Sequence, residues 1–236
     1  MKRIVAITGA GISAESGIKT FRDEDGLWEN YRIEDVATPE AWHKDYKLVL
    51  RFYNERLKQL IHVSPNQAHL SLVRLEANYE VDVITQNVDD LHERAGSSKV
   101  LHLHGELRKK RSQVDPNYIL PIDSNTNEIQ LGDLCPYGQQ MRPHIVWFGE
   151  SVPKMEEAAD IVQKADIILI IGTSMAVYPA AGLIYYAKTE IPVYYIDPKA
   201  DQTTIPNRSV IRIAQKAGSG LPKVVDELIE MSKNGN

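Results

Sequence analysis

Residues 4–28 read IVAITGAGISAESGIKTFRDEDGLW, in which a short apolar strand runs directly into a glycine-rich turn. Glycine at such a turn lets the backbone approach a phosphate group closely. The usual dinucleotide-binding sequence has a third glycine three residues after the second and continues as a helix. Here Ala14 occupies that position, and a charged segment follows Phe21 and Arg22. The stretch predicts a nucleotide-binding turn followed by a long loop instead of a helix. A tight turn without a ligand explains a lone Gly-x-Gly equally well.

The rest of the chain alternates between strand-like and helix-like segments. Several apolar runs lack polar alternation, which is typical of parallel strands covered on both faces. Between them, residues 65–77, 154–165 and 221–231 place apolar side chains at helical spacing, and Pro222 suits a helix start. This alternation predicts an α/β fold with a doubly wound parallel sheet. The expected strands are residues 4–8, 81–85, 100–104, 166–173, 192–197 and 209–214.

Two segments interrupt the alternation. Residues 29–64 contain a helical, aromatic-bearing stretch, and residues 108–143 are polar and rich in turns. Because so long a structureless loop is uncommon in a compact domain, we expect a smaller module inserted into the sheet domain, with ligands bound between the two. The expected division of this single domain is a Rossmann-like part of about 1–28, 80–107 and 144–236, and a small module of about 29–79 and 108–143.

The bulk composition excludes several classes of protein. The 236 residues carry a net charge of −5 without a basic stripe, which argues against a nucleic-acid partner. No apolar run approaches the ~18 residues of a membrane span, and too few residues precede the glycine turn for a signal-peptide core. The single cysteine, Cys135, excludes a disulfide framework and suits a reducing compartment. We expect a cytoplasmic protein without a membrane partner.

Other strand ends carry residues suited to a nucleotide. Gly172, Thr173 and Ser174 form a second glycine-hydroxyl turn after the most apolar strand, and Asp197 ends another strand where ribose hydroxyls are usually bound. Three strand ends with this chemistry outweigh any one of them.

Polar residues also follow the strand at 81–85. Gln86, Asn87 and Asp89 can hydrogen-bond an amide or a ribose hydroxyl. Taken alone, this pattern favours a helix cap over a ligand site, since Asn and Asp often start a helix after a strand.

Two histidines end the strand at 100–104. His102 and His104 share one face of it, because side chains on a strand alternate. His104 directly precedes Gly105 and is a natural general base for a sugar hydroxyl, since histidine titrates near neutrality. A core or capping histidine is the commoner role for any single one, and zinc binding by His-x-His would need further ligands.

Two further patterns suggest substrate contacts. Residues 142–150, RPHIVWFGE, could line an apolar tunnel or pair with a peptide, although a buried strand entering the sheet domain explains them better when taken alone. Tyr53 and Arg56 share a helix face, and a phenol beside a guanidinium suits a carboxylate ligand. The alternative for this pair is a solvated surface or an ion pair with Glu55.

Five motifs of the chain, taken in their order, resemble the sirtuins, the NAD-dependent protein-lysine deacylases. They are GAGISAESGIKTFR, TQNVDDLH, LHGE, VWFGE and GTS. The resemblance runs from about residue 4 to the C-terminal helix. It implies NAD as cofactor, acylated-lysine proteins or peptides as partners, and a lid over NAD formed by the long loop after the glycine turn.

The resemblance also implies a role for each matching residue. Phe21 and Arg22 would cover the nicotinamide end of NAD. The pyrophosphate side would be held by Gly9, Ala10, Gly11, Ser13 and Ala14. The nicotinamide ribose and carboxamide would contact Gln86, Asn87 and Asp89, with Asn87 counted among the catalytic residues. The adenosine half would contact Gly172, Thr173, Ser174, Asp197 and Ala217; family members often carry Asn where Asp197 stands.

His104 would be the proton acceptor. In the implied reaction, the acyl oxygen of the modified lysine attacks C1′ of the nicotinamide ribose as nicotinamide leaves. His104 then draws a proton through the ribose hydroxyls, and the acyl group ends on ADP-ribose. The substrate backbone would pair with Phe148, Gly149 and Glu150 and with residues 177–179. Ile145, Val146 and Phe148 would line the lysine tunnel.

Within the family, FYNER and ATPEAW resemble the subgroup that removes succinyl and malonyl groups. Tyr53 and Arg56 would bind the distal carboxylate, and Ala37 would leave room for the longer acyl chain. Deacetylation could accompany these activities. The alternatives are mono-ADP-ribosyl transfer or NAD hydrolysis, and a non-catalytic sensor of NAD or ADP-ribose.

One departure from the family concerns zinc. Sirtuins normally carry two Cys-x-x-Cys pairs that hold a structural zinc, whereas this chain has only Cys135 in the matching region. Because a tetrahedral site needs four ligands, we predict that the small module has lost its zinc site and is held by packing alone.

Overall fold

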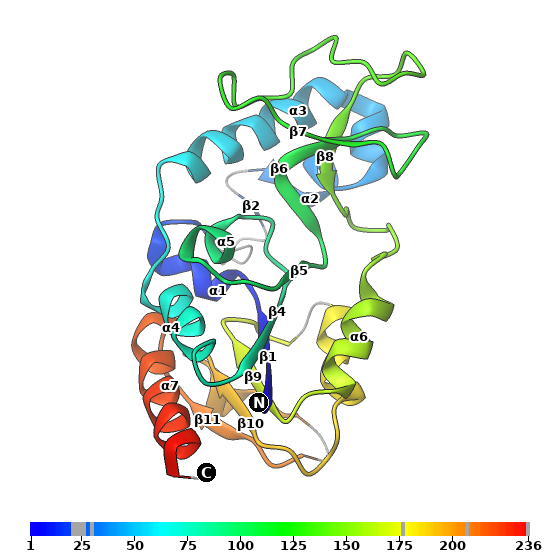
Figure 1. The fold of residues 1–236 in the computed structure, drawn as a ribbon. Helices are drawn as coiled ribbons and strands as arrows, with labels where there is room; N and C mark the ends of the chain where they lie inside the picture. The colour runs from blue at the N-terminus through cyan, green and yellow to red at the C-terminus, as the bar shows by residue number, and fades with distance from the viewer. Residues whose placement is uncertain (20–26, 29–30, 176–177, 206–207, 235–236) are drawn as a thin grey trace.

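The computed structural model describes residues 1–236 apart from residues 20–26, 29–30, 176–177, 206–207 and 235–236. Six parallel strands form its main sheet in the order β11-β10-β9-β1-β4-β5 (Figure 1). Counted along the chain, this is the order 3-2-1-4-5-6 of doubly wound dinucleotide-binding sheets, and it confirms the predicted fold class. The strands are β1 (Arg3–Thr8), β4 (Glu80–Thr85), β5 (Val100–His102), β9 (Ile167–Ile171), β10 (Val193–Ile196) and β11 (Ile211–Ile213).

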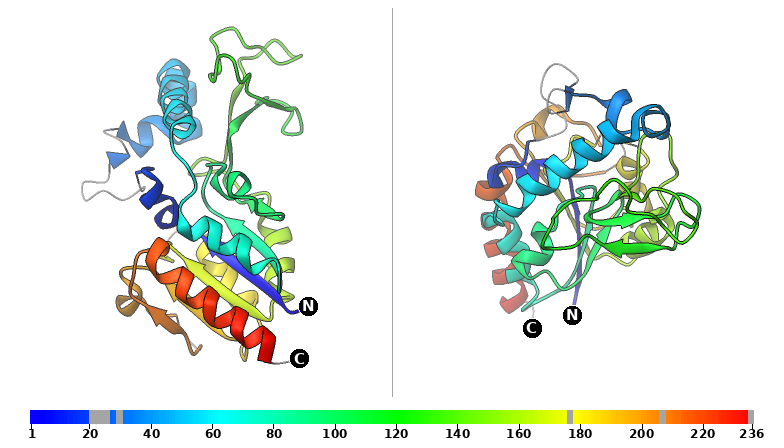
Figure 2. Two further views of the ribbon diagram at one scale, coloured as in Figure 1. Left: turned by 60° about the vertical axis from the view of Figure 1, so that its left-hand side comes forward. Right: turned by 90° about the horizontal axis from the view of Figure 1, so that it is seen from above.

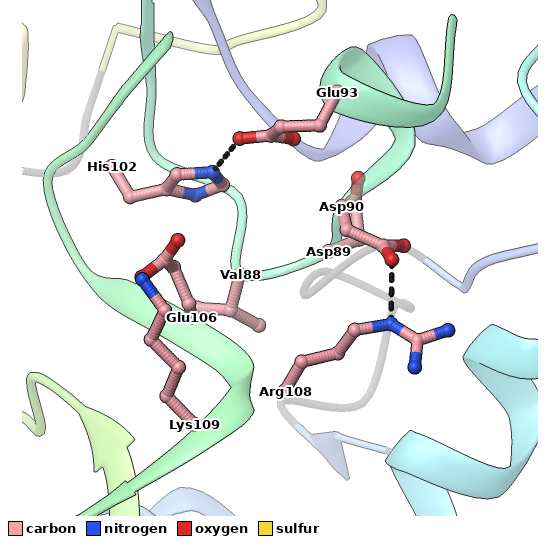
Figure 3. Close-up of a pocket in the computed structure, with 8 residues that line it drawn as sticks. All are labelled: Val88, Asp89, Asp90, Glu93, His102, Glu106, Arg108 and Lys109. Atoms are coloured by element: carbon pink, nitrogen blue, oxygen red, sulfur yellow. Dashed lines mark hydrogen bonds and ion pairs between the residues drawn. The ribbon is translucent and has the colours of Figure 1, made fainter. Parts of the chain in front are cut away.

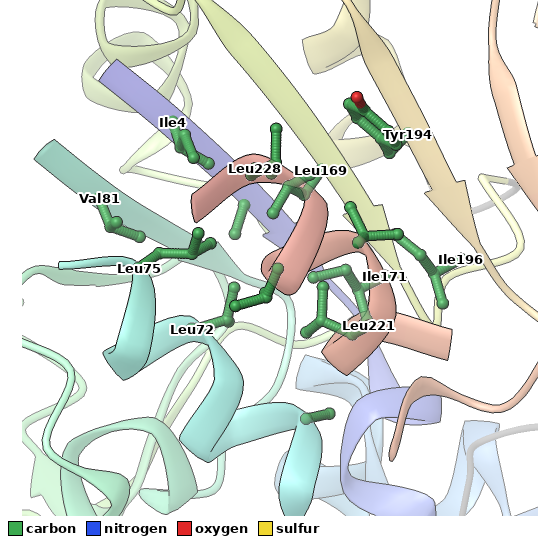
Figure 4. Packing of buried hydrophobic residues seen from close by; sticks show 14 of the residues in the cluster. Ile4, Leu72, Leu75, Val81, Leu169, Ile171, Tyr194, Ile196, Leu221 and Leu228 are labelled. Carbon is green, nitrogen blue, oxygen red and sulfur yellow. The ribbon is translucent and has the colours of Figure 1, made fainter. Parts of the chain in front are cut away.

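Helices cover both faces of this sheet (Figure 2). One face carries α4 (Gln67–Leu75) and α7 (Ala217–Asn234), and the other carries α6 (Met155–Gln163) and the 3-10 helix η2 (Ala180–Tyr186). Strand β1 contributes to both layers, because its side chains alternate. Ile4 packs among the leucines of α4 and α7 (Figure 4), whereas Val5 packs on the opposite face, against α6 and η2. Among the described helices, none combines the length and apolar character required to cross a bilayer.

The turn after β1 differs from the predicted loop. A short helix α1 (Ala10–Ser13), which contains Gly11, and a 3-10 turn η1 (Ala14–Ser16) follow Gly9 directly. Ile12 is fully buried in the sheet core, and Asn66 Nδ2 donates to Ile12 O at 2.8 Å, which fixes this turn from outside. The helix ends at Gly17, whose φ of 96° is accessible chiefly to glycine. The expected lid residues Phe21 and Arg22 lie outside the described residues.

The last helix also begins earlier than its apolar pattern indicates. α7 starts at Ala217, so Pro222 lies inside the helix and not near its first position. The extra turn is rich in small residues, and Gly220 packs so closely on the sheet that a Cβ there would lie 2.9 Å from the side chain of Ile196. A turn without apolar side chains carries no periodic signal, which is why the sequence places the start too late.

The small module has its own core. α3 breaks at Asp45, where φ is −152°, and Trp42, Phe52 and Leu57 from its two segments pack against Met141 and Trp147. Its elements are β2 (Leu27–Trp28), β3 (Tyr31–Arg32), α2 (Ile33–Val36), α3 (Pro39–Ile61) and a three-stranded antiparallel sheet of β7 (Ile119–Pro121), β6 (Gly105–Arg111) and β8 (Arg142–Ile145).

The expected division is wrong at more than one place, since β6 begins at Gly105 and β8 continues to Ile145, inside segments expected in the Rossmann-like part. α4, which lies inside the predicted 29–79 segment, packs with Ala68, Leu72 and Leu75 on the main sheet against α7. The helical pattern itself is confirmed, since all three side chains are fully buried. Periodicity identifies the apolar face of a helix but not the layer that covers it. The remaining short elements are α5 (Leu91–Ala95) and η3 (Ala200–Gln202).

Two backbone turns meet where the strand order reverses, between β1 and β9. Gly9 N donates to Ile171 O at 3.0 Å, and Gly11 N donates to Gly172 O at 2.8 Å. A Cβ on Gly11 would lie 2.6 Å from the Cα of Gly172, closer than real Cβ atoms come to other atoms. The glycines are therefore required first by the contact between the two turns.

We predict that Gly172→Ala destabilises the fold strongly. The residue has a φ of 59°, and its Cβ would lie 2.7 Å from the Cα of Gly11. The left-handed backbone costs ~1–2 kcal/mol, and the steric overlap adds ~1–3 kcal/mol. Gly138→Ala is the matched control, because Gly138 has a φ of 73° with nothing within 4 Å of its Cβ. Urea unfolding should show a clearly larger loss for Gly172→Ala; equal losses would mean that backbone strain alone matters.

Candidate active site

The carboxyl ends of β4, β1 and β9 bring together most of the residues expected to bind a nucleotide. Gln86 N donates to Thr8 O at 2.9 Å, and Gln86 Nε2 donates to Thr173 Oγ1 at 3.1 Å. The second bond links the ends of β4 and β9 across β1. Gln86 and Thr173 thus lie together with the two glycine turns at the point where ligands bind in open α/β sheets.

A buried polar network lies beside these strand ends. Ser13 Oγ donates to Asp89 Oδ2 at 2.9 Å, and Asn87 Nδ2 donates to Ser13 Oγ at 3.1 Å. Leu91 N donates to the other oxygen of Asp89 at 3.1 Å. Asp89 therefore contacts α5 much as a cap would, while it also holds Ser13 and through it Asn87. The bond from Leu91 fits the expected capping role, whereas contact of Asp89 with a nucleotide stays a prediction.

Two histidines of this network have no counterpart in the predicted site. Nδ1 of His69 accepts from Asn66 N at 3.3 Å, and its Nε2 lies 3.5 Å from Ser13 Oγ. Nε2 of His92 lies 3.1 Å from Thr8 Oγ1. The signal for His69 was present in the sequence, because Asn66 and His69 have the spacing of a capping box, which the structure forms.

Burial sets the charge of this network. It lowers the pKa of His69 to about 4 and the pKa of His92 well below its usual value. Burial also raises the pKa of Asp89, although the bonds from Leu91 and Ser13 act against it. At neutral pH both imidazoles are uncharged, so the network offers hydrogen bonds and no buried cation.

His104 has a defined orientation at the end of the strand. Its Nδ1 donates to Gln86 O at 2.9 Å, and its own carbonyl accepts from Val146 N at 2.9 Å. Since Nδ1 carries the hydrogen, Nε2 carries the lone pair, and among the described residues no group hydrogen-bonds to it. Burial lowers the pKa of His104 more than the bond to Gln86 raises it. The ring is therefore a neutral base with an open acceptor.

His102 is held by the neighbouring carbonyl but contacts a carboxylate with its other ring nitrogen. Its Nδ1 lies 2.9 Å from Asn87 O, and its Nε2 lies 2.8 Å from Glu93 Oε1. Burial lowers the pKa of His102, yet the hydrogen bond and charge of Glu93 outweigh it and raise that pKa above its usual value. The two histidines therefore do not act as a His-x-His pair.

We predict opposite titration shifts for these two histidines. In an NMR titration of the ring protons, His104 should protonate below the usual pKa of ~6.5, and His102 above it. Glu93→Gln should lower the pKa of His102, because it removes the neighbouring charge, and leave His104 unchanged. A higher pKa for His104 than for His102 would contradict the assignment.

Tyr53 and Arg56 lie inside the small module and not on a solvated surface. They are 2% and 8% exposed, respectively. Tyr53 Oη accepts from Trp147 Nε1 at 3.0 Å, and the guanidinium of Arg56 stacks 4.3 Å above the Phe52 ring. Burial raises the pKa of Tyr53, so the side chain remains a neutral phenol. A buried cation of this kind is suited to an anionic ligand group.

The segment 142–150 joins the small module and not the main sheet. β8 pairs with β6, after which Phe148 N donates to Ala37 O at 3.0 Å. Ile145 and Ala37 are buried, whereas Phe148 is 45% exposed. Val146 is half-buried and Gly149 is exposed, so residues 148–149 lie at the surface.

The carboxylate of Glu150 is bonded to other groups of the protein. Its carboxylate pairs with Arg142 at 2.7 Å and with Arg111 at 3.2 Å, and it accepts from Trp147 N at 2.8 Å. These bonds fix the turn that carries Phe148 and Gly149. The backbone N–H of Glu150 is also bonded, since it donates to Trp147 O at 3.0 Å.

The residues expected at the adenosine half are more widely spread. Ser174 is exposed, and Asp197 is half-buried and accepts from Lys199 N at 2.8 Å. Ala217 is 2% exposed at the start of α7, where Gly218 N donates to Glu15 Oε2 at 2.7 Å. Ala10 begins α1 and is half-buried, and Ala14 begins η1 and is exposed. Val177 lies outside the described residues.

The residues around Cys135 do not fit a four-thiolate zinc site. Cys135 is the only cysteine, and a hydrogen bond with Ser112 lowers the pKa of its thiol. In the described part of the chain, no potential metal-ligand group includes Cys135. The surrounding loops are anchored by other means, since Asn54 exchanges hydrogen bonds of 2.9 and 3.0 Å with Ile129.

The strand order and the two facing glycine turns define a dinucleotide-binding α/β protein. The sequence profile of the Sir2 family matches residues 9–179. The chain belongs to the Sir2 family. An NAD-dependent protein deacylase of Helicobacter pylori is 52% identical over 232 residues, which cover 98% of this chain and 100% of that relative.

Two solved structures show the same architecture. A Sir2 homologue in complex with NAD is 39% identical with a TM-score of 0.86, covering 98% of this chain and 91% of that one. A Sir2 protein with a deacetylated p53 peptide and 3′-O-acetyl ADP-ribose is 29% identical with a TM-score of 0.77, covering 95% and 92%.

Proposed function

We propose that this chain is an NAD-dependent protein deacylase that transfers an acyl group from lysine to ADP-ribose and releases nicotinamide. The observation that carries the proposal is that Nε2 of His104 is open while Nδ1 donates to Gln86 O. The ring lies between the ends of the sheet strands and the segment at Val146. The name of the H. pylori relative and the peptide complex of the solved Sir2 protein support the same reaction class.

Each group of residues has a distinct task in this reaction. Bound NAD would supply two things: the ribose carbon that accepts the acyl oxygen, and nicotinamide as the leaving group. The glycine turns and α1 hold the phosphate side, and Asn87, fixed by Ser13, presents its amide to the ribose and carboxamide. His104 takes the proton of a ribose hydroxyl at Nε2, and burial keeps water from competing for that position.

The acyl preference follows from the inner face of α3. The acylated lysine enters beside Phe148 and passes Ile145 and Val146, and its chain ends near Tyr53 and Arg56. A buried guanidinium favours a distal carboxylate, which supports succinyl and malonyl groups, with acetyl groups as poorer substrates. Ala37 contributes the space for the longer chain.

The reaction takes place in the cytoplasm, in keeping with the free thiol of Cys135. The small module carries no structural zinc at Cys135, because the chain has no second cysteine.

We predict that Arg56→Met lowers kcat/KM for desuccinylation by about ten- to hundredfold more than for deacetylation. A charge-assisted hydrogen bond contributes ~1.5–3 kcal/mol. An acetyl group has no carboxylate, so the acetylated substrate loses no such bond in the variant. Arg51→Met on the same helix is the control, because Arg51 is exposed. Both rates are measured with peptides that differ only in the acyl group; equal losses for the two substrates would refute the carboxylate site.

The products separate the deacylase from its alternatives. Incubation with NAD and a succinyl-lysine peptide, followed by mass spectrometry, should yield succinyl-ADP-ribose, nicotinamide and free lysine peptide. His104→Ala should lower this turnover by at least ~100-fold, within the range contributed by a general base. Free ADP-ribose without acyl transfer would indicate an NAD hydrolase, ADP-ribosylated peptide a transferase, and no turnover of the wild type a sensor.

A further inference from the structure

A cluster of side chains that could bind a metal ion includes His102. Glu93 comes from α5, His102 ends β5 and Glu106 lies on β6, so three separate elements contribute (Figure 3). One ligand atom from each of these residues lies within 4.8 Å of the other two. In the part of the chain that the structure describes, this is the one group of three or more such residues with this spacing.

The cluster borders a cavity of about 160 Å³. That volume is enough for about five water molecules at ~30 Å³ each, so a hydrated ion fits. The charged residues that line it are four acidic and two basic: Asp89, Asp90, Glu93, Glu106, Arg108 and Lys109. The excess of carboxylates favours a cation in the cavity.

The imidazole of His102 is oriented as metal-binding histidines are. Its side chain is 7% exposed, and Nδ1 is fixed by Asn87 O at 2.9 Å. Such a bond from one ring nitrogen to a carbonyl typically holds a metal ligand in place and directs the other nitrogen at the ion. The other nitrogen, Nε2, faces the carboxylate of Glu93 at 2.8 Å.

We propose that Glu93, His102 and Glu106 bind a divalent first-row transition-metal ion, with zinc as the best-suited ion. One imidazole and two carboxylates are ligands that zinc accepts, and water from the cavity completes a tetrahedral set. Magnesium and calcium, which prefer all-oxygen sites, suit this group less well.

The competing explanation is a pair of ordinary salt bridges. Glu106 pairs with Lys109, and Glu93 pairs with His102. The Lys109 side chain is 43% exposed, so its ammonium can turn to water when an ion binds. Zinc would replace the hydrogen between His102 and Glu93 with bonds to both of them.

This site is distinct from the catalytic base and from the region of Cys135. His104 is bonded to Gln86 O, and its Nε2 does not belong to the cluster. A bound ion would nevertheless join α5, β5 and β6, the elements on either side of His104. Its expected effect is to hold the segment 102–106 in place.

Zinc titration of the full chain by calorimetry tests the proposal. The wild type should bind one zinc ion per chain in the micromolar range. Glu106→Gln and, separately, Glu93→Gln should each weaken binding at least about tenfold, the loss seen even for outer partners of a metal site. At one zinc concentration, zinc should also raise the Tm of the wild type more than that of either variant.

Two control variants locate the site. Glu157→Gln removes the carboxylate of an exposed Lys154–Glu157 pair with the same three-residue spacing as Glu106 and Lys109, and Cys135→Ser removes the thiol. Both should bind zinc as the wild type does. No binding to the wild type, unchanged binding to Glu106→Gln and Glu93→Gln, or loss of binding in Cys135→Ser would overturn the proposal. In a zinc-soaked crystal, an anomalous peak away from Glu93, His102 and Glu106 would also overturn it.

Discussion

The contact between two glycine turns governs this structure. Gly11 donates to Gly172 O at 2.8 Å, and neither residue leaves room for a Cβ. The contact closes the space between β1 and β9 at the point where the strand order reverses. It positions the start of α1, which carries Ser13, and through Ser13 the polar network of Asn87 and Asp89. A side chain at either glycine would separate the turns and displace everything bonded to them.

Burial gives chemically identical side chains different tasks in the same region. His69 and His92 are uncharged hydrogen-bonding groups, His104 is a neutral base with an open nitrogen, and His102 is drawn toward its charged form by Glu93. Adjacent carbonyls, those of Gln86 and Asn87, hold the last two. The backbone fixes each ring, and its surroundings decide whether the ring binds a proton.

The sequence predicts the main sheet well, because buried parallel strands are continuous apolar runs, as in residues 166–173. It also predicts Gln86 and Thr173, since strand ends of one sheet meet at one edge. It fails where contacts form through space. The partner of α4, the burial of Arg56 and the contact of His69 with Ser13 depend on the layer that covers each element. The sequence does not predict the short helix that begins at Ala10, because four residues are too few for a periodic pattern.

The position of His104 in the chain has a mechanical consequence. Its ring is tied to the large part of the protein through Gln86 O, whereas its carbonyl is tied to the small module through Val146 N. The next residue, Gly105, already opens β6 of the small module. His104 therefore connects the large part of the protein directly to the small module. A rotation of the small module relative to the large part would therefore act directly on the position of the imidazole.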